Sequence, residues 1–239
     1  MIYYLAALLL GPVFYLQGRH IRRVTPKLPE PVGARAGQAG AGHPLSVLIV
    51  GDSAAAGVGV EHQRNALSGC LVSELSKTHA VSWRLMASSG DTSAQLLACL
   101  QQAPSDNFET VVVSIGVNDV TALTAGAKWV GNLEAIIETL RNRFAAQRIY
   151  LSSVPPMHEF PALPQPLRWW LGVRARQLNK LMHKVAGRYP YCEYVRVPYV
   201  SDHRYIAADG FHPGAQAYEL WGGHVAALIQ AATAAQPVN

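Results

Sequence analysis

From residue 46 onward, short runs of apolar and β-branched residues alternate with longer segments in which apolar residues recur every three or four positions. The short runs predict five strands, at residues 46–50, 81–86, 110–115, 148–151 and 194–197. The segments between them predict amphipathic helices, the last of which begins near Pro213. Alternation of strands and helices is typical of a parallel sheet with helices on both faces. The pattern therefore predicts an α/β fold, a three-layer α/β/α sandwich whose five-stranded parallel sheet has a flavodoxin-like strand order.

The first 17 residues do not share this alternation. They are apolar and carry no charged side chain, although Gly11-Pro12 interrupts them. Their length is at the lower limit for a spanning helix, so we expect an uncleaved membrane anchor that either spans the bilayer or lies on it. A cleaved signal peptide and a buried N-terminal helix are the alternatives. Basic residues follow this segment, and the positive-inside rule then predicts a cytoplasmic location for the rest of the chain, with a periplasmic or secreted location as the alternative.

Residues 18–44 are basic at first and then rich in proline, glycine and alanine. Such a composition predicts a flexible linker, which leaves one domain over residues 45–235. The chain has a net charge of +5, but Arg19, Arg22, Arg23 and Lys27 cluster directly behind the apolar N-terminus. We therefore expect the acidic partner to be a membrane surface rather than a nucleic acid.

Three cysteines, Cys70, Cys99 and Cys192, lie far apart without a C-x-x-C pair, which argues against a disulfide framework and a zinc knuckle. The sequence also lacks an H-E-x-x-H motif, a G-x-x-x-x-G-K-[ST] phosphate loop and a G-x-S-x-G elbow. We expect neither a metal nor a cofactor. The oligomeric state cannot be predicted from these features.

Small and polar residues follow three of the predicted strands. They are Gly51-Asp52-Ser53, Ser89-Gly90-Asp91 and the segment 116–119, which contains Asn118. Because the carboxyl ends of neighbouring parallel strands meet at one edge of the sheet, we expect these three loops to lie together. This edge is where open α/β sheets bind ligands.

The serine and a distant D-x-x-H motif predict nucleophilic catalysis. A serine hydroxyl needs a base within hydrogen-bond reach, and His212 is the candidate, with Asp209 close enough to orient it. Acyl transfer also needs donors for the oxygen that becomes negative. The backbone amides of Ser53 and Gly90 and the side-chain amide of Asn118 are the candidates.

These residues resemble the four sequence blocks of the SGNH, or GDSL, hydrolases: Gly51-Asp52-Ser53, Gly90, Gly116-x-Asn118-Asp119 and Asp209-x-x-His212. The resemblance covers about residues 45–235, and the sequence around Gly90 and His212 is similar to the thioesterase I and lysophospholipase branch. It implies the SGNH fold, a catalytic serine and histidine, and an oxyanion hole made of Ser, Gly and Asn. Ala54 replaces the leucine of the GDSL motif, a position without a chemical role.

We therefore expect a serine esterase that hydrolyses lipid-like or short- to medium-chain acyl esters through an acyl-enzyme. Between the fourth strand and its helix, a proline-rich segment contains Met157, Phe160 and Leu163, which we expect to form the acyl-binding wall. A carbohydrate O-acetyl esterase and a catalytically silent membrane-tethered binding protein are the alternatives.

Overall fold

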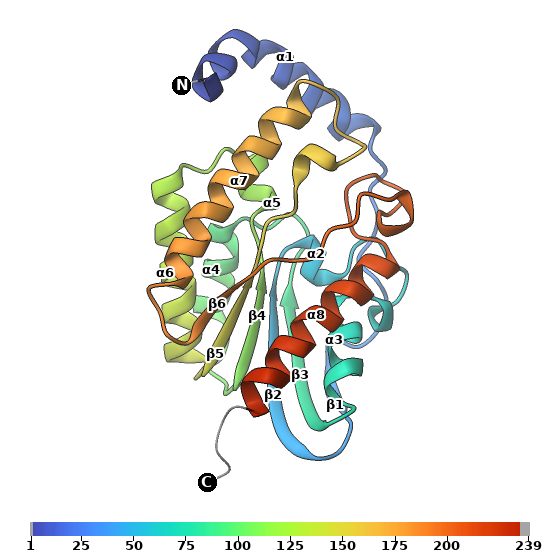
Figure 1. Cartoon of the computed structure of the whole chain (residues 1–239), viewed down its shortest axis with the longest axis vertical. Helices are drawn as coiled ribbons and strands as arrows, with labels where there is room; N and C mark the ends of the chain where they lie inside the picture. The colour runs from blue at the N-terminus through green and yellow to red at the C-terminus, as the bar shows by residue number, and fades with distance from the viewer. Residues whose placement is uncertain (1, 235–239) are drawn as a thin grey trace.

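A mostly parallel sheet of six strands forms the centre of the protein (Figure 1), for which a computed structural model describes residues 2–234. The strand order is β1-β3-β2-β4-β5-β6. The last five in this order are parallel, as predicted: β3 (His79–Ala87), β2 (His43–Gly51), β4 (Thr110–Ser114), β5 (Arg148–Ser152) and β6 (Cys192–Val195). The sheet has one strand more than expected, because β1 (Ala36–Ala39) pairs antiparallel with β3 at the edge.

Helices cover both faces of this sheet, which confirms the predicted three layers. One layer contains α4 (Ser93–Gln102), α6 (Gly126–Arg143) and α7 (Leu167–Ala186), and the other contains α2 (Ser53–Ala56), α3 (Leu67–Leu75) and α8 (Ala215–Ala234). A short helix, α5 (Val117–Thr121), follows β4. Within the described residues there are also 3₁₀ turns at Gln63–Asn65, Met157–Glu159 and His203–Tyr205.

Strand β2 shows why the sequence encodes a sheet with two buried faces. Leu48 and Val50 belong to the apolar core under α4, α6 and α7, whereas Val47 and Ile49 belong to the core under α3 and α8. All four side chains are fully buried. Since successive residues of a strand point to opposite faces, only a continuous apolar run fills both cores.

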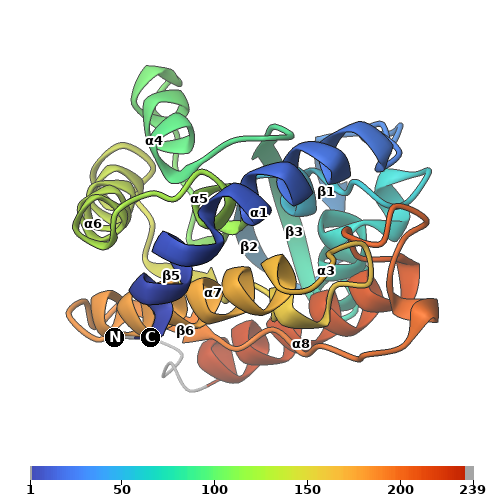
Figure 2. The same ribbon diagram turned by 90° about the horizontal axis from the view of Figure 1, so that it is seen from above.

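The apolar N-terminus forms one helix, α1 (Ile2–Val24), which includes Pro12 and the basic residues that follow. It lies across the upper end of the molecule and packs on α7 (Figures 1 and 2). Phe14 is buried and stacks on Trp170, with 4.8 Å between the ring centroids. The Gln17 side chain donates to the carbonyl of Gln165 and accepts from the amide of Leu167. Within residues 2–234, no helix combines the length and apolar character needed to cross a bilayer.

The structure differs from the flexible linker predicted over residues 18–44. Its first residues continue α1, and Ala36–Ala39 form the edge strand β1. The amide of Leu85 donates to the carbonyl of Arg35 at 2.7 Å, and the amide of Val32 donates to the carbonyl of Glu61 at 3.1 Å. Backbone pairing thus holds a segment whose side chains gave no strand pattern, because a ladder needs only peptide groups.

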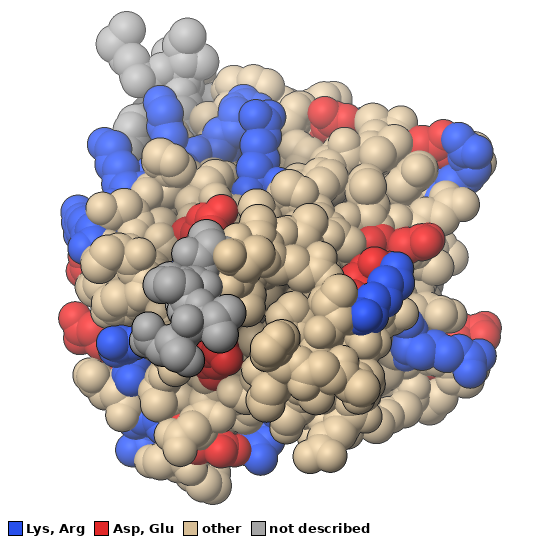
Figure 3. Space-filling view, turned by 60° about the horizontal axis from the view of Figure 1, so that its bottom comes forward, with Lys and Arg blue, Asp and Glu red and all other residues tan. Residues whose placement is uncertain are grey.

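Charged side chains are mixed on the face at the lower end of Figure 1. In Figure 3 this face shows acidic and basic residues interspersed among uncharged ones. The net charge of +5 is therefore not gathered into one continuous basic patch on this face.

Candidate active site

Ser53 lies at the carboxyl end of β2, at the first position of α2. Gly51 has φ +153°, and a Cβ atom there would lie 1.9 Å from the carbonyl oxygen of Ser114, so the turn requires glycine. Asp52 caps the helix by accepting from the amide of Ala54 at 3.1 Å. The turn therefore fixes the direction of the Ser53 side chain at the rim of the sheet.

His212 and Asp209 reach this serine from the loop before α8. The His212 Nε2 atom lies 2.9 Å from the Ser53 Oγ atom. The other ring nitrogen, Nδ1, lies 2.5 Å from Asp209 Oδ2. Asp209 Oδ1 also accepts from the amides of Phe211 and His212, at 2.9 and 3.0 Å. The three predicted residues thus form a continuous hydrogen-bonded series from carboxylate to hydroxyl.

Burial opposes ionisation of both acidic residues of this site, but their pKa values shift in opposite directions. Burial of Asp209 opposes ionisation, but hydrogen bonds from His212 and Phe211 outweigh it and hold the pKa of Asp209 below its usual value. Asp52 is 2% exposed and has fewer compensating bonds, so burial raises its pKa to about 7. Asp209 is therefore the carboxylate that stays ionised beside His212 at neutral pH.

The residues predicted for the oxyanion hole lie at the same edge. The amide of Ser88 donates to the carbonyl of Gly51 at 3.2 Å, which joins the Gly90 loop to the Ser53 turn. Asn118 Nδ2 donates to the carbonyl of Asp91 at 2.9 Å, which joins α5 to the same loop. Among the described residues, no atom accepts a hydrogen bond from the amide of Ser53 or Gly90. Both amides are available to a ligand.

A cavity of about 100 Å³ opens beside Ser53 and His212. Its lining is mostly apolar and comes from the ends of β4, β5 and β6 and from the loop before α8, including Ile115, Val154, Tyr199, Ile206 and Phe211. Of the three residues predicted for an acyl-binding wall, only Phe160 lines this cavity, where it packs edge-on against Phe211 with 5.5 Å between the ring centroids.

Met157 and Leu163 do not line the cavity. Both are buried in the core next to α7, at 0% and 2% exposure. An apolar residue in a proline-rich segment gives no periodic signal that separates a pocket wall from a core position. The residues missed by sequence reasoning, such as Tyr199 and Ile206, follow β6 in a segment without helical or strand spacing. Across the described part of the chain, no three His, Cys, Asp or Glu side chains gather as metal ligands.

The sequence was compared with models of protein families. Residues 49–220 match the model of the GDSL-like lipase/acylhydrolase family, and this range contains the five candidate catalytic and oxyanion-hole residues, Ser53, Gly90, Asn118, Asp209 and His212. The chain belongs to the GDSL-like lipase/acylhydrolase family. It is accordingly a carboxylic ester hydrolase of the SGNH type.

Solved structures share the fold of this GDSL hydrolase at low sequence identity. TesA is 23% identical, with a TM-score of 0.61 over 78% of this chain and 98% of its own. The esterase EstA from Pseudoalteromonas sp. is 18% identical, with a TM-score of 0.61 over 79% of this chain and 98% of its own. The carbohydrate acetylesterase Est24 from Sinorhizobium meliloti is 17% identical, with a TM-score of 0.57 over 79% of this chain and 99% of its own. A search of curated protein sequences found no significant match.

Proposed function

We propose that this GDSL hydrolase cleaves short- to medium-chain acyl esters through an acyl-enzyme on Ser53. The observation that carries the proposal is the hydrogen-bonded series of Asp209, His212 and Ser53, with separations of 2.5 and 2.9 Å. His212 is the general base, and Asp209 holds its ring in the tautomer that leaves Nε2 free to accept a proton.

Ser53 Oγ attacks the ester carbonyl carbon while its proton passes to His212 Nε2. The electron pair of the carbonyl moves to oxygen, and the amides of Ser53 and Gly90 with the side chain of Asn118 stabilise that charge. The intermediate collapses, the bond to the leaving alcohol breaks, and His212 returns the proton to the alkoxide. A water molecule then repeats these steps against the acyl-enzyme and releases the acid and free Ser53.

The size of the cavity supports the proposed acyl length. An apolar cavity of roughly 150 Å³ holds benzene, so the cavity of about 100 Å³ next to Ser53 has room for a chain of roughly four carbons. Its wall at Phe160 and Phe211 is apolar, which favours an acyl chain over a sugar.

Rates on a series of nitrophenyl esters from acetate to palmitate test this substrate class. We expect kcat/KM to be highest for acyl chains of roughly four to six carbons. Shorter chains fill only part of the cavity, and longer chains extend beyond it into solvent. Phe160→Ala should move the optimum to longer chains, since it removes a wall of the cavity. Leu163→Ala is the matched control: it creates space in the core outside the cavity, so it should lower stability without moving the optimum.

Two results would contradict the proposed substrate. A steep preference for acetate, with faster release of acetyl groups from acetylated sugars, would instead support the carbohydrate O-acetyl esterase. If Phe160→Ala leaves the preferred acyl chain length unchanged, the cavity does not bind the acyl chain.

We also propose that the outer face of α1 rests on an anionic lipid surface. Leu9, Val13 and Leu16 are 67%, 40% and 64% exposed on the side of α1 that does not pack on α7. Arg19, Arg22 and Arg23 are exposed within the next two turns. Apolar side chains next to arginines are typical of a helix that lies in the bilayer interface, where basic groups meet lipid phosphates.

Co-sedimentation with vesicles of phosphatidylcholine, with and without phosphatidylserine, tests the lipid surface. We expect stronger binding to the anionic vesicles and a loss of about 10-fold or more in Leu9→Ser/Leu16→Ser, since burying one leucine contributes about 1.5–3 kcal/mol. Leu220→Ser is the control, because Leu220 is 40% exposed on α8, away from α1. Equal binding to both vesicles, or an equal loss in the control, would overturn the proposal.

A further inference from the structure

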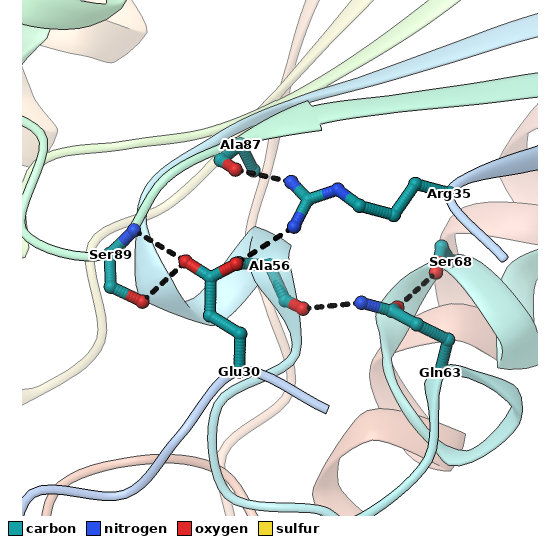
Figure 4. A network of polar contacts seen from close by, with 7 residues as sticks. All are labelled: Glu30, Arg35, Ala56, Gln63, Ser68, Ala87 and Ser89. Atoms are coloured by element: carbon teal, nitrogen blue, oxygen red, sulfur yellow. Dashed lines mark hydrogen bonds and ion pairs between the residues drawn. The ribbon is translucent and has the colours of Figure 1, made fainter. Parts of the chain in front are cut away.

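The loop that carries Gly90 is held by a glutamate from the N-terminal segment (Figure 4). Glu30 Oε1 accepts from the amide of Ser89 at 2.9 Å and from its hydroxyl at 2.8 Å. Glu30 Oε2 accepts from Arg35 Nη1 at 2.8 Å. Arg35 in turn donates through Nη2 to the carbonyl of Ala87, the last residue of β3. Glu30 and Arg35 together thus bind the backbone on both sides of Ser88.

The backbone of the N-terminal segment fixes both of these side chains. The Arg35 carbonyl accepts from Leu85 of β3, and the strand β1 that begins at Ala36 continues this pairing. Val32 exchanges hydrogen bonds with the segment after α2: its amide donates to Glu61, and its carbonyl accepts from Gln63. The Glu30–Arg35 pair is therefore held from two sides, unlike an isolated surface ion pair whose side chains must be ordered for the contact to form.

Elsewhere the Gly90 loop is anchored at Ser88, Asp91 and Ser93. The carbonyl of Asp91 accepts from Asn118 Nδ2, and its amide donates to the carbonyl of Ser88 at 3.3 Å. Ser88 is bonded to Gly51 at the start, and Ser93 donates its amide and hydroxyl to the buried carboxylate of Asp119 at 2.8 and 2.7 Å at the end. Gly90 has φ +92°, and an added Cβ would meet no atom within 4 Å, so packing does not restrain it. The hydrogen bonds to Glu30 are therefore the restraint nearest to the Gly90 amide on its N-terminal side.

Glu30 has the charge that this contact needs. Burial opposes its ionisation, but hydrogen bonds from Ser89 and Arg35 outweigh burial and hold the pKa of Glu30 below its usual value. The carboxylate is therefore ionised at neutral pH and makes charge-assisted hydrogen bonds, which are stronger than neutral ones.

We propose that Glu30, supported by Arg35, is a positioning residue that fixes the Gly90 amide for the oxyanion of the reaction. This inference rests on the proposed function of Ser53, Gly90 and Asn118. Neither Glu30 nor Arg35 falls in the part of the chain that matches the family model, residues 49–220. The N-terminal segment thus contributes to catalysis in this chain without touching the substrate.

Steady-state kinetics of Glu30→Ala test this role. We expect kcat to fall about 10-fold while KM changes less than about two-fold, because a displaced oxyanion donor weakens the transition state rather than substrate binding. Glu30→Gln keeps an acceptor for Ser89 and should recover part of kcat. Glu74→Ala is the matched control, since Glu74 lies on α3, forms an ion pair with Lys77, and has a side chain 42% exposed against 33% for Glu30. The control should match the wild type in kcat, because an exposed ion pair contributes little to the fold.

A second background separates positioning from a general loss of structure. Alanine at position 90 is strained at φ +92°, so we expect Gly90→Ala to displace the backbone amide that donates to the oxyanion. Adding Glu30→Ala to this variant should then lower kcat by less than about two-fold further. Fully additive losses would overturn the proposal, as would a Glu30→Ala enzyme with the kcat of Glu74→Ala.

Amide hydrogen exchange of a peptide over residues 86–92 gives a reading that does not depend on activity. The Ser89 amide donates to Glu30, so Glu30→Ala should accelerate its exchange about 10-fold or more, and Glu74→Ala should not. If the wild-type protein neither hydrolyses esters nor is labelled by a serine-directed probe, the proposed function is refuted, but the positioning role is not. Unchanged exchange in Glu30→Ala would refute the positioning role, whether or not the wild type is active.

Discussion

Ser53→Ala is expected to lower kcat by about 10⁶-fold, the loss seen when the nucleophile of a serine hydrolase is removed. Alanine keeps the first position of α2, and Asp52 still caps that helix, so the variant should fold like the wild type. It loses only the hydroxyl that lies 2.9 Å from His212 Nε2. A covalent fluorophosphonate probe should label the wild type and not Ser53→Ala, because the phosphonyl group bonds to the attacking oxygen.

Ser73→Ala provides the control for this result. Ser73 is an exposed serine of α3, so its loss should change neither the rate nor the labelling. A Ser53→Ala protein that is still labelled, or that keeps more than about a tenth of the wild-type kcat, would remove Ser53 from the nucleophile's role. Wild-type protein that binds esters but shows no labelling would favour the silent binding protein considered from the sequence.

The residues of the candidate site were predictable because each follows an element with a strong pattern. Val47 to Val50 form a run that is buried on both faces, and such a run places Ser53 at the carboxyl edge of a parallel sheet. The same rule places Gly90 after β3 and Asn118 after β4. Topology therefore brings together residues far apart in the sequence, without any knowledge of their contacts.

The contribution of residues 25–42 was not predictable by the same reasoning. Strand β1 has the sequence Ala-Gly-Gln-Ala, which lacks the β-branched and aromatic residues that mark a strand. Its position depends on an edge of β3 that offers unpaired peptide groups. The bond from Ser89 to Glu30 spans 59 residues and follows no periodicity. Sequence patterns report burial and local geometry, so a polar contact between two partly exposed segments gives no signal.

Helix α1 shows a different limit. Residues 2–16 of this helix have an apolar sequence without a polar face, so periodicity does not indicate which face packs on the protein. In the structure Phe14 faces Trp170, while Leu16 is exposed. The hydrophobic pattern could not separate a membrane anchor from a helix that packs on α7, because both require apolar residues.

Asp209→Asn is expected to lower kcat by about 10⁴-fold without removing the nucleophile or the base. Asp209 Oδ2 lies 2.5 Å from His212 Nδ1, and only an acceptor at that place holds the proton on Nδ1 and leaves Nε2 free for Ser53. An asparagine can present its NH₂ group to Nδ1 instead and stabilise the tautomer that cannot accept the serine proton. Asp106→Asn is the control, since Asp106 pairs with Arg84 on the surface. A loss below about 10-fold would reduce the site to a Ser53–His212 dyad.

The pH dependence of stability gives this variant a second, independent reading. The pKa of Asp209 is lower in the folded protein than its usual value, so its ionised form stabilises the fold at pH values above the unfolded pKa, near 4. That contribution is lost as the pH falls through the lower, folded pKa. Urea unfolding should therefore show Asp209→Asn less stable than the wild type at pH 7, and the difference should shrink toward pH 3. Asp52 remains in both proteins, so its raised pKa cancels in the comparison. A difference that stays constant with pH would mean that lost packing, rather than lost charge, causes the change.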